Sequence, residues 1–403
     1  MGTRPGRLPA RAPAGARRRQ AHASAARGSQ DLCARPQPSS LTVCHDGRVT
    51  QVIAAATALP PHRYEQAEIT RAVADMLNLR GQRRELLERF HAASGVETRH
   101  LVLPLDEYAT LPDFGAANDA YLRFAVEFGA EATREALAGA GLEPADVDVL
   151  MTVSVTGIGA PSVDARLVAA LGLRPDVRRV PVFGLGCVAG AAGLARLHDM
   201  LAGDGDGIAV LLAAEACSLT VQRNDESIAN LVASALFGDG VSAVVLAGEA
   251  RARELGLHGP EVVSTRSRLY PDTERVMGWD VGGSGFRIVL AASVADVVEK
   301  YLGEDVATFL DEHGLEIDDI TSWVAHPGGP KVMDAMGSAL GLADGELSAA
   351  RRSLATVGNL SSASVLHVLR WTLAHPPPPG SPGLMLAMGP GFCSELVLLR
   401  WPE

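Results

Sequence analysis

The sequence predicts an α/β protein made of layered helices and strands, and three observations support this fold class. Apolar, β-branched runs typical of buried strands alternate along the chain with Ala- and Leu-rich runs of helical length. The pattern occurs in two segments of similar size that divide near residue 250, which indicates an internal duplication. One cysteine, Cys187, lies on a tight turn between a predicted strand and a predicted helix.

The composition sets limits on the class of protein. The chain has 403 residues, of which 47% are hydrophobic, enough for one large core or two fused ones. No apolar run reaches the roughly 18 residues that cross a bilayer, so no membrane span is expected. The net charge of −11 argues against nucleic acid as a partner. The five cysteines form no CxxC pair and no Cys/His metal spacing, which favours a reducing, cytoplasmic location without a disulfide framework.

Residues 1–47 differ in composition from the rest of the chain. They are rich in Arg, Ala, Pro and Ser and show no hydrophobic period. Arg17, Arg18 and Arg19 are not followed by an apolar segment, so a secretion signal is not expected. We expect a disordered tail or a gene start placed too far upstream, and an organellar transit peptide stays open as an alternative.

The first ordered half is expected over 48–249. Its strands are predicted from β-branched apolar runs at 49–55, 98–102, 147–153, 176–183, 207–216 and, after the turn Gly238-Asp239-Gly240, within 236–248. Its helices are predicted at 64–90, 118–141, after the loop 154–161, and at 188–202. Pro60 and Pro61 end the first strand, and Gly203 ends the last helix of the set.

The second half, 250–403, repeats the alternation of helices and strands. Helices are predicted at 294–313 and 359–374, and strands at 320–325, 383–388 and 393–400. The Pro-rich segment 376–382 separates the last helix from the two closing strands.

Cys187 is a candidate nucleophile because of the turn on which it lies. Gly184, Gly186 and Gly190 surround it and let the backbone and a substrate approach closely. A helix N-terminus stabilises a thiolate, so we expect a lowered thiol pKa. A small buried side chain is the plain alternative. A second alternative is a dinucleotide-binding loop, because Gly184, Gly186 and Ala189 match the loose GxGxxA fingerprint of nucleotide-binding oxidoreductases.

Two further residues occupy positions where ligands gather. His326 ends a predicted buried strand and is followed by Pro327-Gly328-Gly329. In α/β sheets, ligands bind at the carboxyl ends of the strands. Asn359 lies where a helix is predicted to begin, which also suits a helix N-cap.

Cys187, His326 and Asn359, in this order and on these motifs, resemble the thiolase-fold condensing enzymes. Within that superfamily the chain resembles the type III polyketide synthases, the chalcone synthase-like family. The resemblance runs from about residue 48 to the C-terminus and includes Leu236-Phe237-Gly238-Asp239-Gly240 and Gly389-Pro390-Gly391. Thiolases proper carry a second late cysteine, and Cys393 lies in a predicted strand. Type III ketoacyl-ACP synthases usually carry His-Gln-Ala-Asn where this chain has His326-Pro327-Gly328-Gly329.

The resemblance implies a thiolase fold, in which two duplicated halves form a five-layered αβαβα core. It implies that Cys187 accepts the starter acyl group from coenzyme A. His326 and Asn359 would then stabilise the enolate that decarboxylation of malonyl-CoA leaves. No metal or redox cofactor is implied, and the partners are acyl-CoA, malonyl-CoA and a second copy of the chain in a homodimer.

The resemblance also assigns residues to the substrate cavity. Phe237 and Phe286 match the two gatekeepers, Arg89 matches part of the CoA-binding basic cluster, and Glu215 lies below the active site. The expected cavity residues are Thr156, Cys217, Thr220 and Ser361. The loop 157–161 crosses the dimer interface in the family, with Ala160 in place of a frequent Met.

The small Thr156 and Cys217 resemble bacterial members that accept long acyl starters. We therefore expect a fatty acyl starter and an alkylresorcinol or alkylpyrone product. The alternatives are a naphthalene-type or small aromatic polyketide from malonyl-CoA alone, and condensation like that of ketoacyl-ACP synthase III.

Overall fold

The computed structural model describes residues 49–403 and Gly2, so the predicted tail otherwise lies outside the described residues. The strands are β1 (Thr50–Ala58), β2 (His62–Glu65), β3 (Thr98–Leu101), β4 (Val149–Ser154), β5 (Arg178–Phe183), β6 (Ile208–Ala216), β7 (Asp239–Gly248), β8 (Glu261–Leu269), β9 (Met277–Gly282), β10 (Gly285–Leu290), β11 (Ser322–Ala325), β12 (Pro382–Gly389) and β13 (Cys393–Arg400). The helices are α1 (Gln66–Met76), α2 (Gly81–Ala92), α3 (Phe114–Ala140), α4 (Val163–Leu171), α5 (Ala189–Ala202), α6 (Ile228–Leu236), α7 (Glu249–Leu255), α8 (Val294–Asp311), α9 (Pro330–Leu340), α10 (Ser348–Val357) and α11 (Ser362–Ala374).

One nine-stranded sheet forms the frame, in the order β11-β12-β13-β8-β1-β7-β6-β4-β5. Strands of the first predicted half occupy one end of this order and strands of the second half occupy the other. The two sets meet only at β1 and β8, through the pairs Thr50↔Val262 and Gln51↔Glu261. The division of the chain into 48–249 and 250–403 stays a prediction.

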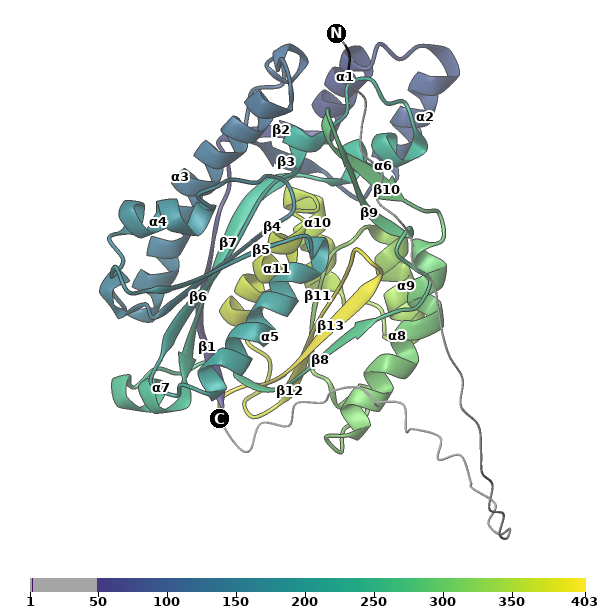
Figure 1. The fold of residues 1–403 in the computed structure, drawn as a ribbon. Coiled ribbons are helices and arrows are strands. Elements are labelled where there is room, and N and C mark those ends of the chain that lie inside the picture. The colour runs from purple at the N-terminus through teal and green to yellow at the C-terminus, as the bar shows by residue number, and fades with distance from the viewer. Residues whose placement is uncertain (1, 3–48) are drawn as a thin grey trace, which may run out of the picture. The chain divides into compact units, whose positions relative to one another are not determined.

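Helices and strands alternate in five layers (Figure 1). Helices α3 and α4 cover the outer face of the first set of strands, and α8 and α9 lie on the far side of the second set. Helices α5 and α11 lie between the two sets and contact strands of both. Strand β6 shows why this order is stable, because all nine of its residues are buried. Its side chains alternate between the layer with α3 and the layer with α5, so both faces exclude water.

Two of the expected elements differ in the structure. The expected helix 64–90 is two helices, α1 and α2, because Asn78 (φ 52°) and Gly81 (φ 51°) turn the chain between them. The expected buried strand 176–183 is β5, which is mostly exposed because it is the last strand of the sheet and pairs only with β4. No helix in the described part of the chain is long and apolar enough to cross a lipid bilayer.

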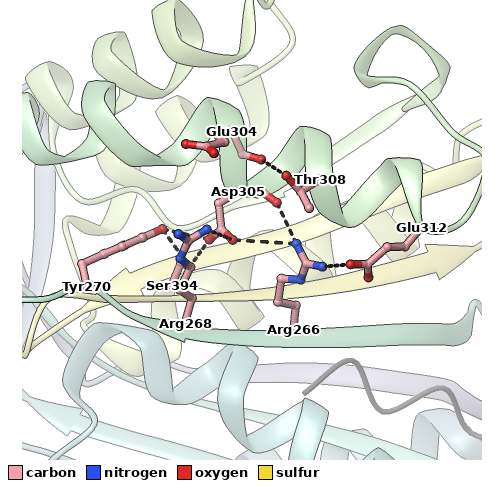
Figure 2. A network of polar contacts seen from close by, with 8 residues as sticks. All are labelled: Arg266, Arg268, Tyr270, Glu304, Asp305, Thr308, Glu312 and Ser394. Carbon is pink, nitrogen blue, oxygen red and sulfur yellow. Dashed lines mark hydrogen bonds and ion pairs between the residues drawn. The ribbon is translucent and has the colours of Figure 1, made fainter. Parts of the chain in front are cut away.

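A buried network of charges holds α8 against β8 and β13 (Figure 2). The carboxylate of Asp305 accepts hydrogen bonds from Tyr270 Oη at 2.9 Å and Ser394 Oγ at 2.7 Å. It also forms an ion pair with Arg268 at 3.3 Å. Arg266 donates to the Asp305 carbonyl at 3.2 Å and pairs with Glu312. Because removing a charge from water is costly, the several partners of Asp305 are what make its burial tolerable.

Candidate active site

The backbone of the turn places Cys187 at the start of α5. A short 3-10 turn, Gly186–Val188, leads directly into the helix. Gly186 has φ 59°, and a Cβ at this position would lie 2.6 Å from Pro390 Cγ. Any larger residue would therefore displace the Gly389-Pro390-Gly391 loop or lose the turn. The predicted strand–turn–helix geometry around Cys187 is confirmed.

The Cys187 thiol is buried and hydrogen-bonded. Its Sγ donates to Ser361 Oγ at 3.8 Å, and only 7% of the residue is exposed. Burial raises the pKa of the Cys187 thiol to about 12, although the Ser361 hydrogen bond opposes this shift. The sequence predicts a lowered thiol pKa, whereas burial in the folded chain raises it.

His326 follows β11 at the carboxyl end of the sheet, as predicted. Its backbone N–H donates to Leu386 O at 2.9 Å, so strand pairing fixes the residue. Both ring nitrogens are buried and lack a hydrogen-bond partner within residues 49–403. Burial lowers the pKa of His326 to about 3, so the imidazole is neutral at neutral pH. A buried neutral imidazole with two unused nitrogens is suited to receive a proton from a thiol and to bind a substrate oxygen.

Asn359 lies before α11, and its side chain is held by the backbone around it. Its Oδ1 accepts from Ser361 N at 2.8 Å, and Nδ2 donates to Gly328 O at a long 3.5 Å. Helix α11 begins at Ser362 with Ser361 as its N-cap, so Asn359 is not the N-cap. The long Nδ2 contact leaves this amide group available as a donor to another oxygen.

A set of contacts joins Cys187 and Asn359 to the loop that follows His326. Cys187 contacts Ser361, Ser361 is bound by Asn359, and Asn359 reaches Gly328 in the loop after His326. The structure thus brings together residues from the two predicted halves. A thiol, a neutral imidazole and a primary amide are the groups that can form and cleave thioesters and stabilise an oxyanion.

A cavity of about 40 Å³ opens onto the thiol. We call it the Cys187 cavity, and it is lined by Val155, Gly186, Cys187, Cys217, Phe237, Met277, Gly278, Trp279, Ile288, Leu290, Ser361 and Pro390. A second cavity of about 60 Å³ lies toward α1, and we call it the α1-side cavity. Cys217, Phe237, Trp279 and Ile288 line both cavities and form the wall between them.

The expected cavity residues do not all line the same cavity. Phe237, Cys217 and Ser361 line the Cys187 cavity, whereas Thr220 lines the α1-side cavity and donates its hydroxyl to Cys217 O at 2.7 Å. Thr156 lines neither of these cavities. Its hydroxyl donates to Glu215 Oε2 at 2.6 Å, and the residue lines a larger cavity of about 420 Å³, which shares Thr220 with the α1-side cavity.

Phe286 lies in an aromatic cluster outside the Cys187 cavity. Its ring packs edge-on against Phe114 at 5.2 Å and beside Phe183 at 5.9 Å and Trp279 at 6.3 Å. Trp279, from the β9–β10 hairpin, is the aromatic side chain that lines the Cys187 cavity beside Phe237. Sequence reasoning missed Trp279, because this hairpin was not predicted. The only sequence feature that could have pointed to Trp279 is its position as an aromatic residue in a Gly-rich stretch.

Glu215 is fully buried at the carboxyl end of β6 and accepts several hydrogen bonds. Ser154 Oγ donates at 3.2 Å, Val155 N at 3.1 Å, and Ser362 Oγ also contacts it. Burial raises the pKa of Glu215 above its ordinary value. The residue ties the loop after β4 to the first turn of α11 and so supports Ser361.

Arg89 is exposed on α2 and lines none of the three cavities named above. A role for it in CoA binding stays a prediction.

The chain matches two family models that together cover most of its length. Residues 37–250 match the chalcone and stilbene synthases, N-terminal domain, and residues 261–401 match the chalcone and stilbene synthases, C-terminal domain.

Individual relatives agree with these matches. The chain is 56% identical to a 1,3,6,8-tetrahydroxynaphthalene synthase from Streptomyces peucetius subsp. caesius, over 88% of this chain and 94% of that protein. It is 37% identical to a putative chalcone synthase from Bacillus subtilis, over 76% of this chain and 87% of that protein. The solved structure of 1,3,6,8-tetrahydroxynaphthalene synthase from Streptomyces coelicolor A3(2), a bacterial type III polyketide synthase, superposes with a TM-score of 0.82. The two are 30% identical, and the superposition covers 88% of this chain and 99% of that one. The five-layered thiolase fold is confirmed.

Proposed function

Because the chain belongs to the chalcone and stilbene synthase family, we propose that it builds a naphthalene-type or small aromatic polyketide from malonyl-CoA alone. The family membership establishes the coarser statement. The chain is a type III polyketide synthase, an acyltransferase that condenses malonyl-CoA with loss of carbon dioxide. It uses coenzyme A thioesters without a further cofactor. Membership also favours this assignment over nucleotide binding at Gly184 and Gly186.

One observation carries the finer proposal. The relative at 56% identity is named for a tetrahydroxynaphthalene, a ring system that bears no alkyl chain. Such a skeleton can be assembled wholly from the two-carbon units that malonyl-CoA supplies. The fatty acyl starter expected above is therefore less well supported than its alternative.

In the proposed mechanism, the Cys187 thiol passes its proton to His326 and attacks a CoA thioester. The carbonyl carbon becomes bonded to sulfur, and coenzyme A leaves with the proton that His326 returns. A malonyl-CoA molecule then loses carbon dioxide, and the electron pair of the broken bond passes into an enolate. The His326 ring and Asn359 Nδ2 donate hydrogen bonds to the enolate oxygen. The enolate carbon attacks the acyl-Cys187 thioester, and the thiolate leaves.

The proposal predicts product formation from a single substrate. Incubation with radiolabelled malonyl-CoA, without carrier protein, NADPH or added starter, should give a labelled aromatic product at the full rate. Adding acyl-CoAs of graded chain length should not transfer label into alkyl products. Absence of product until an acyl-CoA starter is added would contradict the proposal.

A fatty acyl starter is the second candidate, and one observation favours it. The α1-side cavity has several apolar lining residues, among them Ile69, Val73 and Met76 of α1. The wall that includes Cys217 separates it from the Cys187 cavity. An alkyl chain there would gain about 0.8 kcal/mol for each buried CH₂. If this candidate is correct, Cys217→Phe lowers kcat/KM more for long starters than for short ones, and alkyl products appear in the preceding experiment.

We also propose a homodimer that forms along β5. This strand ends the sheet with an unpaired edge, and Phe183 on it and Ile158 beside it are 49% and 45% exposed. Both residues line one hollow together with Pro181 and Gly157. Exposed apolar side chains beside a free strand edge are typical of a surface that pairs with another chain.

The dimer proposal predicts that a charge at this surface separates the subunits. Ile158→Glu should shift the mass measured by light scattering from dimer to monomer at micromolar concentration, because the carboxylate would be buried unpaired. Leu255→Glu, at a residue on α7 that is 44% exposed, is the matched control and should remain dimeric. A wild-type protein that is monomeric, or an Ile158→Glu variant that remains dimeric, would rule out this interface.

A further inference from the structure

The segment that carries Asn359 is attached to the end of α6. The last carbonyl groups of a helix have no partner within it and need donors from elsewhere. Here three neighbouring carbonyls receive three different donors. Ala235 O accepts from Gln66 Nε2 at 2.9 Å, Leu236 O accepts from Asn359 N at 2.8 Å, and Phe237 O accepts from Arg99 Nη1 at 2.7 Å. The catalytic Asn359 is thus one of the groups that terminate this helix.

We call the place where the Asn359 segment binds the end of α6 the junction. Arg99 contacts both of these segments. Its guanidinium binds Phe237 O with one nitrogen and Gln66 Oε1 with the other, at 2.8 Å. Its aliphatic part lies beside Gly358, where a Cβ would come within 3.0 Å of both Cγ and Cδ. Gly358 also has φ 75°, a backbone conformation that side chains disfavour. Arg99 therefore contacts Phe237 on one segment and Gly358 on the other. These residues are the neighbours of Leu236 and Asn359, which the hydrogen bond joins.

The environment keeps Arg99 charged although it is only 2% exposed. Burial lowers the pKa of Arg99 to about 10, and the nearby Asp239 opposes this shift. Asp239 is itself held by Ser218 N and Val102 N, each at 2.8 Å. A planar, charged fork can bind two acceptors at once, which a lysine ammonium does less well.

We infer that Arg99 is a positioning residue for the condensation reaction, which fixes the Asn359 amide by holding the Phe237 carbonyl and packing against Gly358. The inference rests on the proposed role of Asn359 in binding the enolate oxygen. Arg99 contacts the backbone beside Asn359 and touches no reacting atom. Loss of Arg99 should therefore lower kcat, because the amide donor is no longer held where the oxyanion develops.

Arg266 provides a matched control, because it is a buried arginine with no contact to the site. It is 3% exposed and donates to Asp305 O (Figure 2). Its guanidinium lies 5.2 Å from the centre of the Phe309 ring. Like Arg99, it is a buried charge that donates to a backbone carbonyl. Its loss should lower the melting temperature without a specific effect on catalysis.

The experiment compares malonyl-CoA decarboxylation by Arg99→Met, Arg99→Lys and Arg266→Met, each in a Cys187→Ala background. This background removes acyl transfer and leaves the enolate-forming step. We expect Arg99→Met to lower kcat by about tenfold or more with KM nearly unchanged. Arg99→Lys should fall between Arg99→Met and the parent, and Arg266→Met should retain the parent kcat. Equal kcat in Arg99→Met and Arg266→Met would overturn the inference.

Amide hydrogen exchange gives a readout that does not depend on the proposed function. Asn359 N–H and Gly238 N–H form the two backbone bonds of the junction, so both should exchange faster in Arg99→Met and not in Arg266→Met. Unchanged exchange at both amides would overturn the inference even if decarboxylation falls. If Arg99→Met does not fold, Arg99→Lys decides by the same two measurements. If decarboxylation is absent in the Cys187→Ala parent, the proposed function fails, while exchange still tests the role of Arg99.

Discussion

Cys187→Ala is expected to abolish polyketide formation, because no other group in the Cys187 cavity can hold the growing chain as a thioester. Cys217 lines the same cavity, but its thiol lies outside the series of contacts from Cys187 through Ser361 to Asn359 that the mechanism uses. Slow decarboxylation of malonyl-CoA should persist, because His326 and Asn359 remain in place. The measurement is the yield of labelled product and of carbon dioxide from radiolabelled malonyl-CoA.

The control for this variant is Cys393→Ala. Cys393 is the late cysteine that a thiolase-type reaction would use, and its Sγ donates to Pro390 O at 3.4 Å. We expect Cys393→Ala to keep the wild-type rate of condensation. Appreciable polyketide from Cys187→Ala would contradict the mechanism, and loss of condensation in Cys393→Ala would indicate a two-cysteine reaction.

Asn359→Asp is expected to cause the second largest loss. The carboxyl group keeps an oxygen that can accept from Ser361 N, so the backbone of the site should be retained. It removes the NH₂ donor that is proposed to bind the enolate oxygen. Loss of one such donor costs about two to three orders of magnitude in kcat, or roughly 3–4 kcal/mol of transition-state stabilisation.

Comparison of the changes in kcat and KM identifies the cause of that loss. KM for malonyl-CoA should change little, because the donor acts on charge that develops only in the transition state. The rate at which iodoacetamide alkylates Cys187 should also stay at the wild-type value, which shows that the nucleophile is undisturbed. A kcat within about threefold of wild type would remove Asn359 from the proposed mechanism.

Local sequence patterns predicted most of the central elements of the fold. The apolar run of β6 and the glycines around Cys187 determine structure almost alone, because a strand buried on both faces and a turn with positive φ permit few residue types. Strand β5 shows the limit of this reasoning. Its apolar residues suit a buried strand, and only the sheet order reveals that it lies at an edge.

The sequence predicted those residues of the candidate site that lie on a recognisable local motif. Cys187, His326 and Asn359 each follow a recognisable strand or turn, and the structure connects them. Trp279 and Arg99 were not found, because their roles depend on neighbours distant in sequence, such as Phe237 and Gly358. The raised pKa of the Cys187 thiol also has no local signal, since its cause is burial by the complete fold.

The packing of Pro390 against Gly186 and the contact of Ser361 with Cys187 have a consequence for synthesis of the chain on the ribosome. The nucleophile is translated long before the two residues that enclose it. Until β12 and the loop after it are complete, Pro390 does not cover the thiol, which stays more accessible to oxidants. The end of the polypeptide therefore shields its own reactive sulfur, and a prematurely terminated chain would present that sulfur unprotected to the cell.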